Sequence, residues 1–234
     1  MKLVIFDVDG TLTDTNEVDG ACFQLAFQQE FGLRKISRDW ESYNYSTDQG
    51  IATEVLTSFF NRNPLDSELA RARTRFIRNL REAYCSNPLN FQEVRGAGST
   101  LRLLREETDW KVAIATGCWA ESARFKLQRA GIQTDTPFAS CEDSISRDGI
   151  VSRVIEKAKF YYECKDFTTV VFVGDGVWDV TTARNLGIGF VGISANEKRQ
   201  RLKKAGAKFI CTDFQLTPVF LNYLNHFDAY ESSN

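Results

Sequence analysis

The sequence lacks several features that mark specialised classes of protein. No apolar run approaches the roughly 20 residues that a membrane-spanning helix needs. The amino terminus enters an apolar segment after a single lysine, Lys2, which is unlike a secretory signal peptide. Lys+Arg 29 against Asp+Glu 31 gives a formal net charge of -2, whereas a nucleic-acid-binding domain would be basic. We therefore expect a globular cytoplasmic protein that binds neither a membrane nor a nucleic acid.

Histidine is also scarce, and the cysteines are scattered. His226 is the only histidine, and no two cysteines form a C-x-x-C pair, so a zinc site is not expected. Scattered cysteines of this kind are typical of reduced thiols in a cytosolic protein. The six are Cys22, Cys85, Cys118, Cys141, Cys164 and Cys211. We interpret Cys118, which follows one of the motifs below, as a packing or lining residue.

Strand-like and helical patterns alternate along most of the chain. The strand-like segments are rich in Val, Ile and Phe with little alternation, as in parallel strands buried on both faces. They span residues 2–7, 111–116, 169–174, 188–193 and 208–211. Helical patterns cover 98–107, 119–130, 149–163, 178–186, 196–205 and 216–226. This alternation predicts an α/β fold with a doubly wound parallel sheet, and ligands of such sheets bind at the carboxyl ends of the strands.

Strand-like segments are missing between residues 16 and 93. Apolar residues instead recur at helical spacing over 17–31, 48–61 and 66–84. A block of helices directly after the first strand predicts a small bundle above the carboxyl edge of the sheet. We therefore expect an inserted α-helical cap domain at 16–93 and a core domain made of 1–15 and 94–234.

The most informative stretch is Asp7-Val8-Asp9-Gly10-Thr11, at the end of the first strand. Side chains of a strand alternate between its faces, so Asp7 and Asp9 can reach toward one side. Two close carboxylates repel each other unless a cation lies between them or one of them holds a proton. The pattern therefore indicates a site for a hard metal ion and a phosphate.

Two further motifs end later strands. Thr116-Gly117 precedes a helix, and backbone N–H groups at such a helix start bind phosphate oxygens, although a plain turn has the same pattern. Asp175 lies between two glycines at a strand end, and Asp179 follows one helical turn later. Structural roles for these residues are a turn for Asp175 and a helix cap for Asp179. The two acidic motifs together favour a functional site.

In this order the motifs resemble those of the haloacid dehalogenase (HAD) superfamily. The helical block resembles the cap of its phosphoglycolate phosphatase and β-phosphoglucomutase branch. This resemblance implies a Rossmann-like core and a Mg²⁺-dependent site for phosphoryl transfer. Asp9 distinguishes the chain from the members that cleave carbon–halogen bonds, which lack this second carboxylate, so dehalogenation is not expected.

The resemblance also implies a role for each acidic residue. Asp7 would attack phosphorus and form an aspartyl-phosphate. Asp9 would act as general acid and base, with a pKa that we expect neighbouring carboxylates to raise. The Asp7 and Asp175 carboxylates and the Asp9 carbonyl oxygen would hold Mg²⁺. Asp179 would orient this cluster or a basic residue.

Thr116, Gly117 and a basic residue would bind the phosphoryl oxygens. Arg147, just before the 149–163 helix, is our first choice for the basic residue. Lys157, inside that helix, is the alternative, although a basic residue on an amphipathic helix is usually solvated.

The expected partner is a small phosphorylated metabolite, and the protein would be a monomer or a homodimer. Asp48 or Gln49, at the start of a cap helix, is a candidate contact for a substrate hydroxyl, and Trp119 either narrows the pocket or belongs to the core. We favour a phosphatase similar to phosphoglycolate phosphatase. The alternatives are a phosphomutase of the β-phosphoglucomutase type and a non-catalytic binding protein on the same fold.

Overall fold

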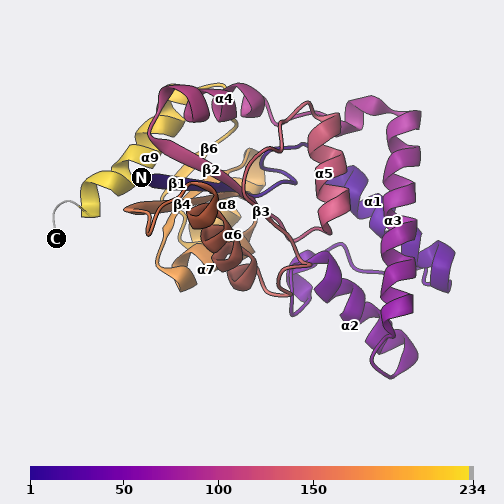
Figure 1. Cartoon of the computed structure of the whole chain (residues 1–234). Helices are drawn as coiled ribbons and strands as arrows, with labels where there is room; N and C mark the ends of the chain where they lie inside the picture. Colours follow the sequence, from indigo (N-terminus) through magenta and orange to yellow (C-terminus); the bar gives the residue numbers. More distant parts are fainter. Residues whose placement is uncertain (232–234) are drawn as a thin grey trace.

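The computed structural model describes residues 1–231, except the side chains of residue 196 and of residues 228–231. In this part of the chain six strands form one parallel sheet in the order β3-β2-β1-β4-β5-β6 (Figure 1). β1 therefore lies between β2 and β4, inside the sheet. The strands are β1 (Lys2–Phe6), β2 (Trp110–Ala115), β3 (Phe138–Ala139), β4 (Thr169–Gly174), β5 (Gly189–Ile193) and β6 (Phe209–Cys211).

Helices cover both faces of the sheet, which confirms the predicted doubly wound architecture. Along β1, Leu3 and Ile5 pack into one apolar cluster, and Val4 and Phe6 pack into the other. The first cluster includes side chains of α6 (Arg147–Tyr161), α7 (Val177–Leu186) and α8 (Asn196–Ala205). The second includes side chains of α4 (Ala97–Glu107), α5 (Ala120–Arg129) and α9 (Thr217–Glu231). Burial on both faces explains why the strands are apolar without alternation.

The elements between β1 and α4 are all helical and lie at one end of the molecule (Figure 1). We call them the cap helices and the rest of the molecule the core. The cap helices are α1 (Asn16–Phe31), η1 (Trp40–Ser42), α2 (Asp48–Phe60), α3 (Asp66–Ser86) and η2 (Pro88–Phe91). Phe23 and Phe76 of the cap helices pack edge to face, with ring centroids 5.7 Å apart. Trp119, which precedes α5, stacks on Phe23 at 6.0 Å and is fully buried. Trp119 is therefore a core residue rather than a wall of the pocket.

Element bounds agree with the sequence patterns within one or two residues at most ends. Thr47 caps α2, because its hydroxyl accepts a hydrogen bond from the Gly50 N–H at 3.2 Å. Gly131, with φ +74°, follows the end of α5. The prediction omitted β3, since a strand of two residues leaves no pattern, and it ended α9 too early.

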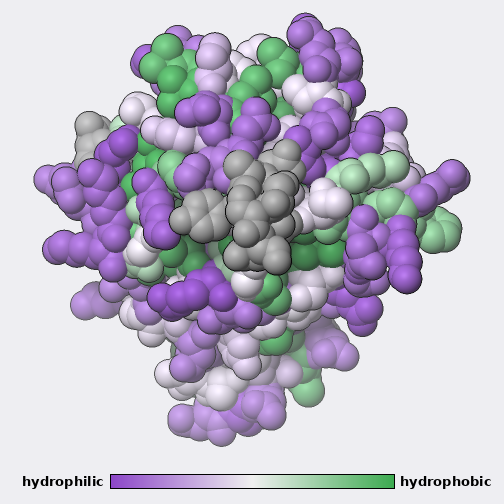
Figure 2. Space-filling model, turned by 90° about the vertical axis from the view of Figure 1, so that its left-hand side faces the viewer, coloured by the Kyte–Doolittle hydropathy of each residue, from purple (hydrophilic) through white to green (hydrophobic). Residues whose placement is uncertain are grey.

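The end of the core that lies away from the cap helices carries mainly hydrophilic side chains in the view of Figure 2. Among the described residues, none of the helices combines the length and apolar character needed to cross a bilayer. All six cysteines are free thiols, as expected.

Candidate active site

The three sequence motifs meet at the carboxyl ends of adjacent strands. Asp7 follows β1, Thr116 follows β2 and Asp175 follows β4, and all three line one cavity of about 70 Å³ between the core and the cap helices. The loop after β1 depends on Gly10, whose φ is +72°. A Cβ atom at this position would lie 2.1 Å from Oδ2 of Asp175, so only glycine permits this close approach.

Asp7, Asp175 and Asp179 form one acidic cluster. Each offers a carboxylate oxygen, and these oxygens lie within 4.8 Å of one another. Asn16 Nδ2 donates a hydrogen bond to Asp175 Oδ2 at 3.0 Å. Asp179 Oδ2 accepts one from the Gly176 N–H at 3.0 Å, at the start of α7. Asp179 thus caps its helix and also belongs to the cluster.

Arg147, the first residue of α6, supplies positive charge to this cluster. Its Nη1 lies 3.1 Å from Asp7 Oδ1 and 3.4 Å from Asp179 Oδ1. The alternative basic residue, Lys157, instead contacts Asp143 at 2.6 Å and does not line the cavity. A Cβ atom on Gly117 would lie 2.6 Å from Arg147 Nη2, which explains the glycine after Thr116.

The positive charge near this cluster does not neutralise all of its negative charge. Burial, followed by the nearby Asp7 carboxylate, raises the pKa of Asp175 to about 7. The same two causes raise the pKa of Asp179 well above its usual value, although Arg147 opposes them. Burial also raises the pKa of Asp7 despite Arg147. Arg147 and Lys198, which lies 3.7 Å from Asp175, thus offset only part of the effect of burial and mutual repulsion. Carboxylate oxygens are also the ligands that Mg²⁺ prefers.

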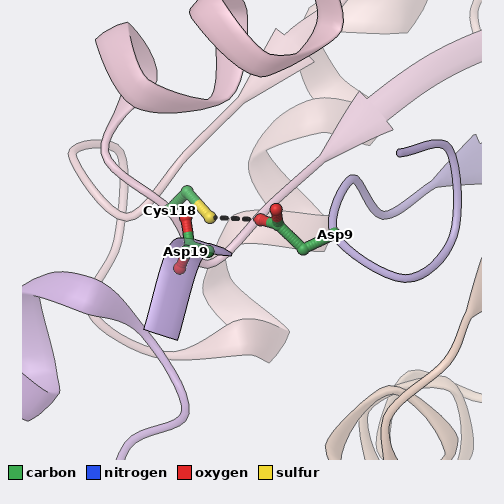
Figure 3. Close-up of side chains that lie close together, drawn as sticks. All are labelled: Asp9, Asp19 and Cys118. Carbon is green, nitrogen blue, oxygen red and sulfur yellow. Dashed lines mark hydrogen bonds between the residues drawn. The ribbon is translucent and has the colours of Figure 1, made fainter. Parts of the chain in front are cut away.

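The carboxylate of Asp9 belongs to a second cluster, which it forms with Asp19 and Cys118 (Figure 3). Lys126 joins this cluster through its ammonium group. Lys126 Nζ lies 2.6 Å from Asp9 Oδ2 and also contacts the Asp19 carboxylate. The Cys118 thiol donates to Asp9 Oδ2 at 2.9 Å, and the Thr15 hydroxyl donates to Asp9 Oδ1. Because the Lys126 ammonium contacts Asp9, Asp19 and Cys118, it already supplies the positive charge of this second cluster.

This environment overturns one expectation about Asp9. Neighbouring carboxylates were expected to raise its pKa. Burial does raise it, but the Lys126 ammonium and the hydrogen bonds from Cys118, Lys126 and Thr15 outweigh burial and lower the pKa of Asp9 below its usual value. Asp9 is therefore an ionised carboxylate in the free protein.

The sequence analysis did not identify Lys126 and Asp19. A signal existed for Lys126, because it falls on the apolar stripe of α5 that Ala123 and Leu127 define at helical spacing. A lysine on the apolar face of a helix is expected to form an ion pair with a buried acidic group. Lys126 is paired, and it is fully buried.

Residues 46–49 join the cap helices to the core. The Asp48 N–H donates to the Gly117 carbonyl at 2.8 Å, and Asp48 Oδ2 accepts from the Trp119 N–H at 2.9 Å. Gln49 Oε1 accepts from Trp119 Nε1 at 2.9 Å, and Arg147 Nε donates to the Ser46 carbonyl at 2.9 Å. Of the two residues expected to contact a substrate hydroxyl, only Asp48 lines the cavity.

Similar solved structures share this architecture. A hydrolase from Pseudomonas syringae is 19% identical, with a TM-score of 0.69 over 90% of this chain and 93% of that one. A Bacteroides vulgatus protein provisionally assigned as a beta-phosphoglucomutase is 15% identical, with a TM-score of 0.69 over 96% and 90%. A predicted phosphoglycolate phosphatase from Haemophilus somnus is 19% identical, with a TM-score of 0.59 over 92% and 95%. At these identities the likeness shows the fold.

A family model gives the more specific result. No curated protein matches this chain in sequence. The model of haloacid dehalogenase-like hydrolases matches residues 1–187, which include Asp7, Thr116, Arg147 and Asp175. The chain therefore belongs to the family of haloacid dehalogenase-like hydrolases.

Proposed function

We propose that the protein is a Mg²⁺-dependent phosphatase that hydrolyses a small phosphorylated metabolite. The observation that carries this proposal is the meeting of Asp7, Asp175, Arg147 and Thr116 in one cavity at the carboxyl ends of β1, β2 and β4. Asp179 lies beside them in the same acidic cluster. In this proposal residues 16–93 form a cap domain over a core made of residues 1–15 and 94–234. The small cavity suits a metabolite rather than a macromolecule.

The donor set fits a hard divalent cation. Asp7 and Asp175 would hold Mg²⁺ through their carboxylates, and Asp9 would do so through its carbonyl oxygen. Asp179 keeps its own partners, Gly176 N–H and Arg147, and so supports the cluster. When bound, Mg²⁺ would neutralise the charge of the phosphoryl oxygens and reduce their repulsion from Asp7.

Asp7 is the proposed nucleophile. It attacks phosphorus, the bond to the leaving oxygen breaks, and the phosphoryl group is transferred to the carboxylate. Arg147, 3.1 Å from Asp7 Oδ1, is placed to hold a phosphoryl oxygen beside the attacking atom. Thr116 and Gly117 complete the phosphate-binding side of the cavity.

Asp9 is the proposed acid and base, and its lowered pKa favours the second role. As an ionised carboxylate it can take the proton from the water that hydrolyses the aspartyl-phosphate. In the first step it must instead give a proton to the leaving oxygen. A dianionic phosphate bound nearby raises the pKa of a carboxyl, so substrate binding itself promotes that protonation.

Replacing Asp7 tests the proposal. Asp7→Asn keeps the size of the side chain but removes the nucleophile, so we expect Mg²⁺-dependent hydrolysis of p-nitrophenyl phosphate to fall at least about 10³-fold. Asp14→Asn is the matched control, because Asp14 is exposed and lies in the same loop. A circular-dichroism spectrum like that of the wild type would show that the fold is kept. Substantial residual activity in Asp7→Asn would refute the nucleophile, and no activity in the wild type across a broad phosphate panel would favour a non-catalytic binding protein.

A phosphomutase is the second candidate, because the fold also matches the provisionally assigned beta-phosphoglucomutase. A mutase returns the phosphoryl group to a sugar instead of to water. Incubation with β-glucose 1-phosphate separates the two functions: a mutase yields the 6-phosphate isomer, and a phosphatase yields inorganic phosphate.

A further inference from the structure

The cavity has two chemically different sides. The core supplies the side that serves the phosphoryl group, with Asp7, Thr116, Gly117, Arg147 and Asp175. The cap helices supply the opposite side, where a leaving group would lie. This side combines two carboxylates, Asp19 and Asp48, with the aromatic side chains of Phe23 and Trp40.

The described lining residues on the cap side of the cavity include no cationic side chain. Among the residues that line the cavity, Arg147 is the only one with a cationic side chain, and it belongs to the core side. Lys126 lies behind the lining and contacts Asp9 and Asp19. Other cationic side chains outside the lining also face carboxylates. Lys198 lies 3.7 Å from Asp175 on the core side, Arg38 pairs with Glu17 at 2.9 Å, and Arg201 pairs with Glu41 at 2.5 Å. A second anionic group on the substrate would therefore face the Asp19 and Asp48 carboxyls on this side, without a cationic side chain among the lining residues there.

From this arrangement we infer that the substrate is a phosphate ester of a small amino alcohol, whose ammonium group lies between Asp19, Asp48 and the aromatic rings. Aromatic faces and carboxylates together are the groups by which proteins bind ammonium ions. The inference rests on the proposed phosphatase function and specifies its substrate class.

The electrostatics of the two carboxyls agree with this inference. Burial raises the pKa of Asp48 to about 8, and the Asp19 carboxylate adds to the effect. Burial raises the pKa of Asp19 to about 6, although Lys126 opposes it. Lys126 thus offsets the negative charge of Asp19 only in part, and Asp48 is held by the Trp119 N–H rather than by a cation. An ammonium group on the substrate would supply further positive charge beside both carboxyls.

A series of equal-sized esters tests the inference. The probes are 2-aminoethyl phosphate, 2-hydroxyethyl phosphate and phosphoglycolate, which differ in the charge of one terminal group. With Mg²⁺ we expect kcat/KM to decrease in that order, with at least a tenfold difference between the amine and the carboxylate. Equal values, or a preference for phosphoglycolate, would overturn the inference and leave the phosphatase function intact.

Binding of analogues that are not hydrolysed separates this inference from the proposed function. Calorimetry would compare 2-aminoethylphosphonate with phosphonoacetate on the Mg²⁺-loaded wild-type protein. At least tenfold tighter binding of the amine supports the inference even if no ester is turned over. Equal or weaker binding of the amine refutes it, whatever the activity on p-nitrophenyl phosphate.

An isosteric variant tests the contribution of Asp48. Asp48→Asn removes the charge and keeps a carbonyl oxygen that can accept from the Trp119 N–H. We expect the preference for the amine over the carboxylate to fall at least fivefold. Glu54→Gln is the control, since Glu54 lies on the same helix outside the cavity and accepts from the Asn44 N–H. A preference unchanged in Asp48→Asn would remove Asp48 from the ammonium site.

Discussion

Lys126 gives the most direct test of the electrostatics described above. Its side chain is fully buried, and its ammonium contacts Asp9 and Asp19. Lys126→Met keeps an unbranched side chain of similar length but leaves the partly buried carboxylates of Asp9 and Asp19 without this cation. Removing one partner of a buried ion pair costs about 3–5 kcal/mol. For a chain of this size each kcal/mol lowers Tm by about 2–4 °C, so we expect Tm to fall by about 6–20 °C.

The assay is thermal unfolding by circular dichroism at pH 7.5, with Lys157→Met as the matched control. Lys157 pairs with Asp143 at the surface, where its side chain is 45% exposed. An exposed pair of this kind contributes about 0–1 kcal/mol. In the double variant Lys126→Met/Asp19→Asn only one carboxylate, that of Asp9, is left without its cation. This variant should therefore recover part of the decrease in Tm. A Tm for Lys126→Met no lower than that of Lys157→Met would refute the buried ion pair.

The same variant has a kinetic consequence. Lys126 contributes to the lowered pKa of Asp9. Without the ammonium the pKa of Asp9 rises, so the limb of the pH profile of kcat/KM that reports on Asp9 should move to higher pH. A profile that does not move would show that Lys126 has only a structural role.

Two further predictions concern the acidic cluster. Asp175 has a pKa of about 7, above the ordinary 3.9 or so, so its contribution to the stability of the metal-free protein is complete below about pH 4 and is lost as the pH rises through 7. The free energy of unfolding by urea should therefore fall between pH 5 and pH 8, by up to about 3 kcal/mol more than in Asp175→Asn. Saturating Mg²⁺ should reduce this difference, and equal slopes in both proteins would refute the raised pKa. Gly10→Ala should abolish Mg²⁺-dependent activity, because the new Cβ atom would collide with Asp175 Oδ2. Gly32→Ala is the control, since Gly32 has a similar φ of +73° but no atom within 4 Å of the added Cβ. This control should lose only about 1 kcal/mol of stability and keep its activity. An active Gly10→Ala variant would contradict the described approach of the loop to Asp175.

The sequence predicted the strand ends well because two independent patterns coincide there. Runs such as Val171-Phe172-Val173 predict buried parallel strands, and Gly-Asp-Gly punctuation predicts where the chain turns. Asp7, Thr116 and Asp175 then lie at one edge of the sheet by topology alone, since the carboxyl ends of parallel strands share an edge.

Other parts depend on contacts that no local pattern encodes. Asp19 of α1 and Lys126 of α5 are 107 residues apart in sequence and come into contact only in the folded chain. The lowered pKa of Asp9 likewise depends on its contact with Lys126, which forms only in the folded chain. The roles of Asp48 and Gln49 as partners of Trp119 depend likewise on the position of the cap helices over β2.

The hydrogen bonds of residues 46–49 have a consequence for the reaction cycle. Arg147, which faces the nucleophile, also donates to the Ser46 carbonyl, and Gly117 of the phosphate side accepts from Asp48. Arg147 and Gly117, which would bind the phosphate, therefore also form hydrogen bonds to the segment that leads into the cap helix α2. For the proposed phosphatase we therefore expect release of inorganic phosphate to be coupled to breakage of these hydrogen bonds, and the frequency of that breakage would set an upper limit on kcat.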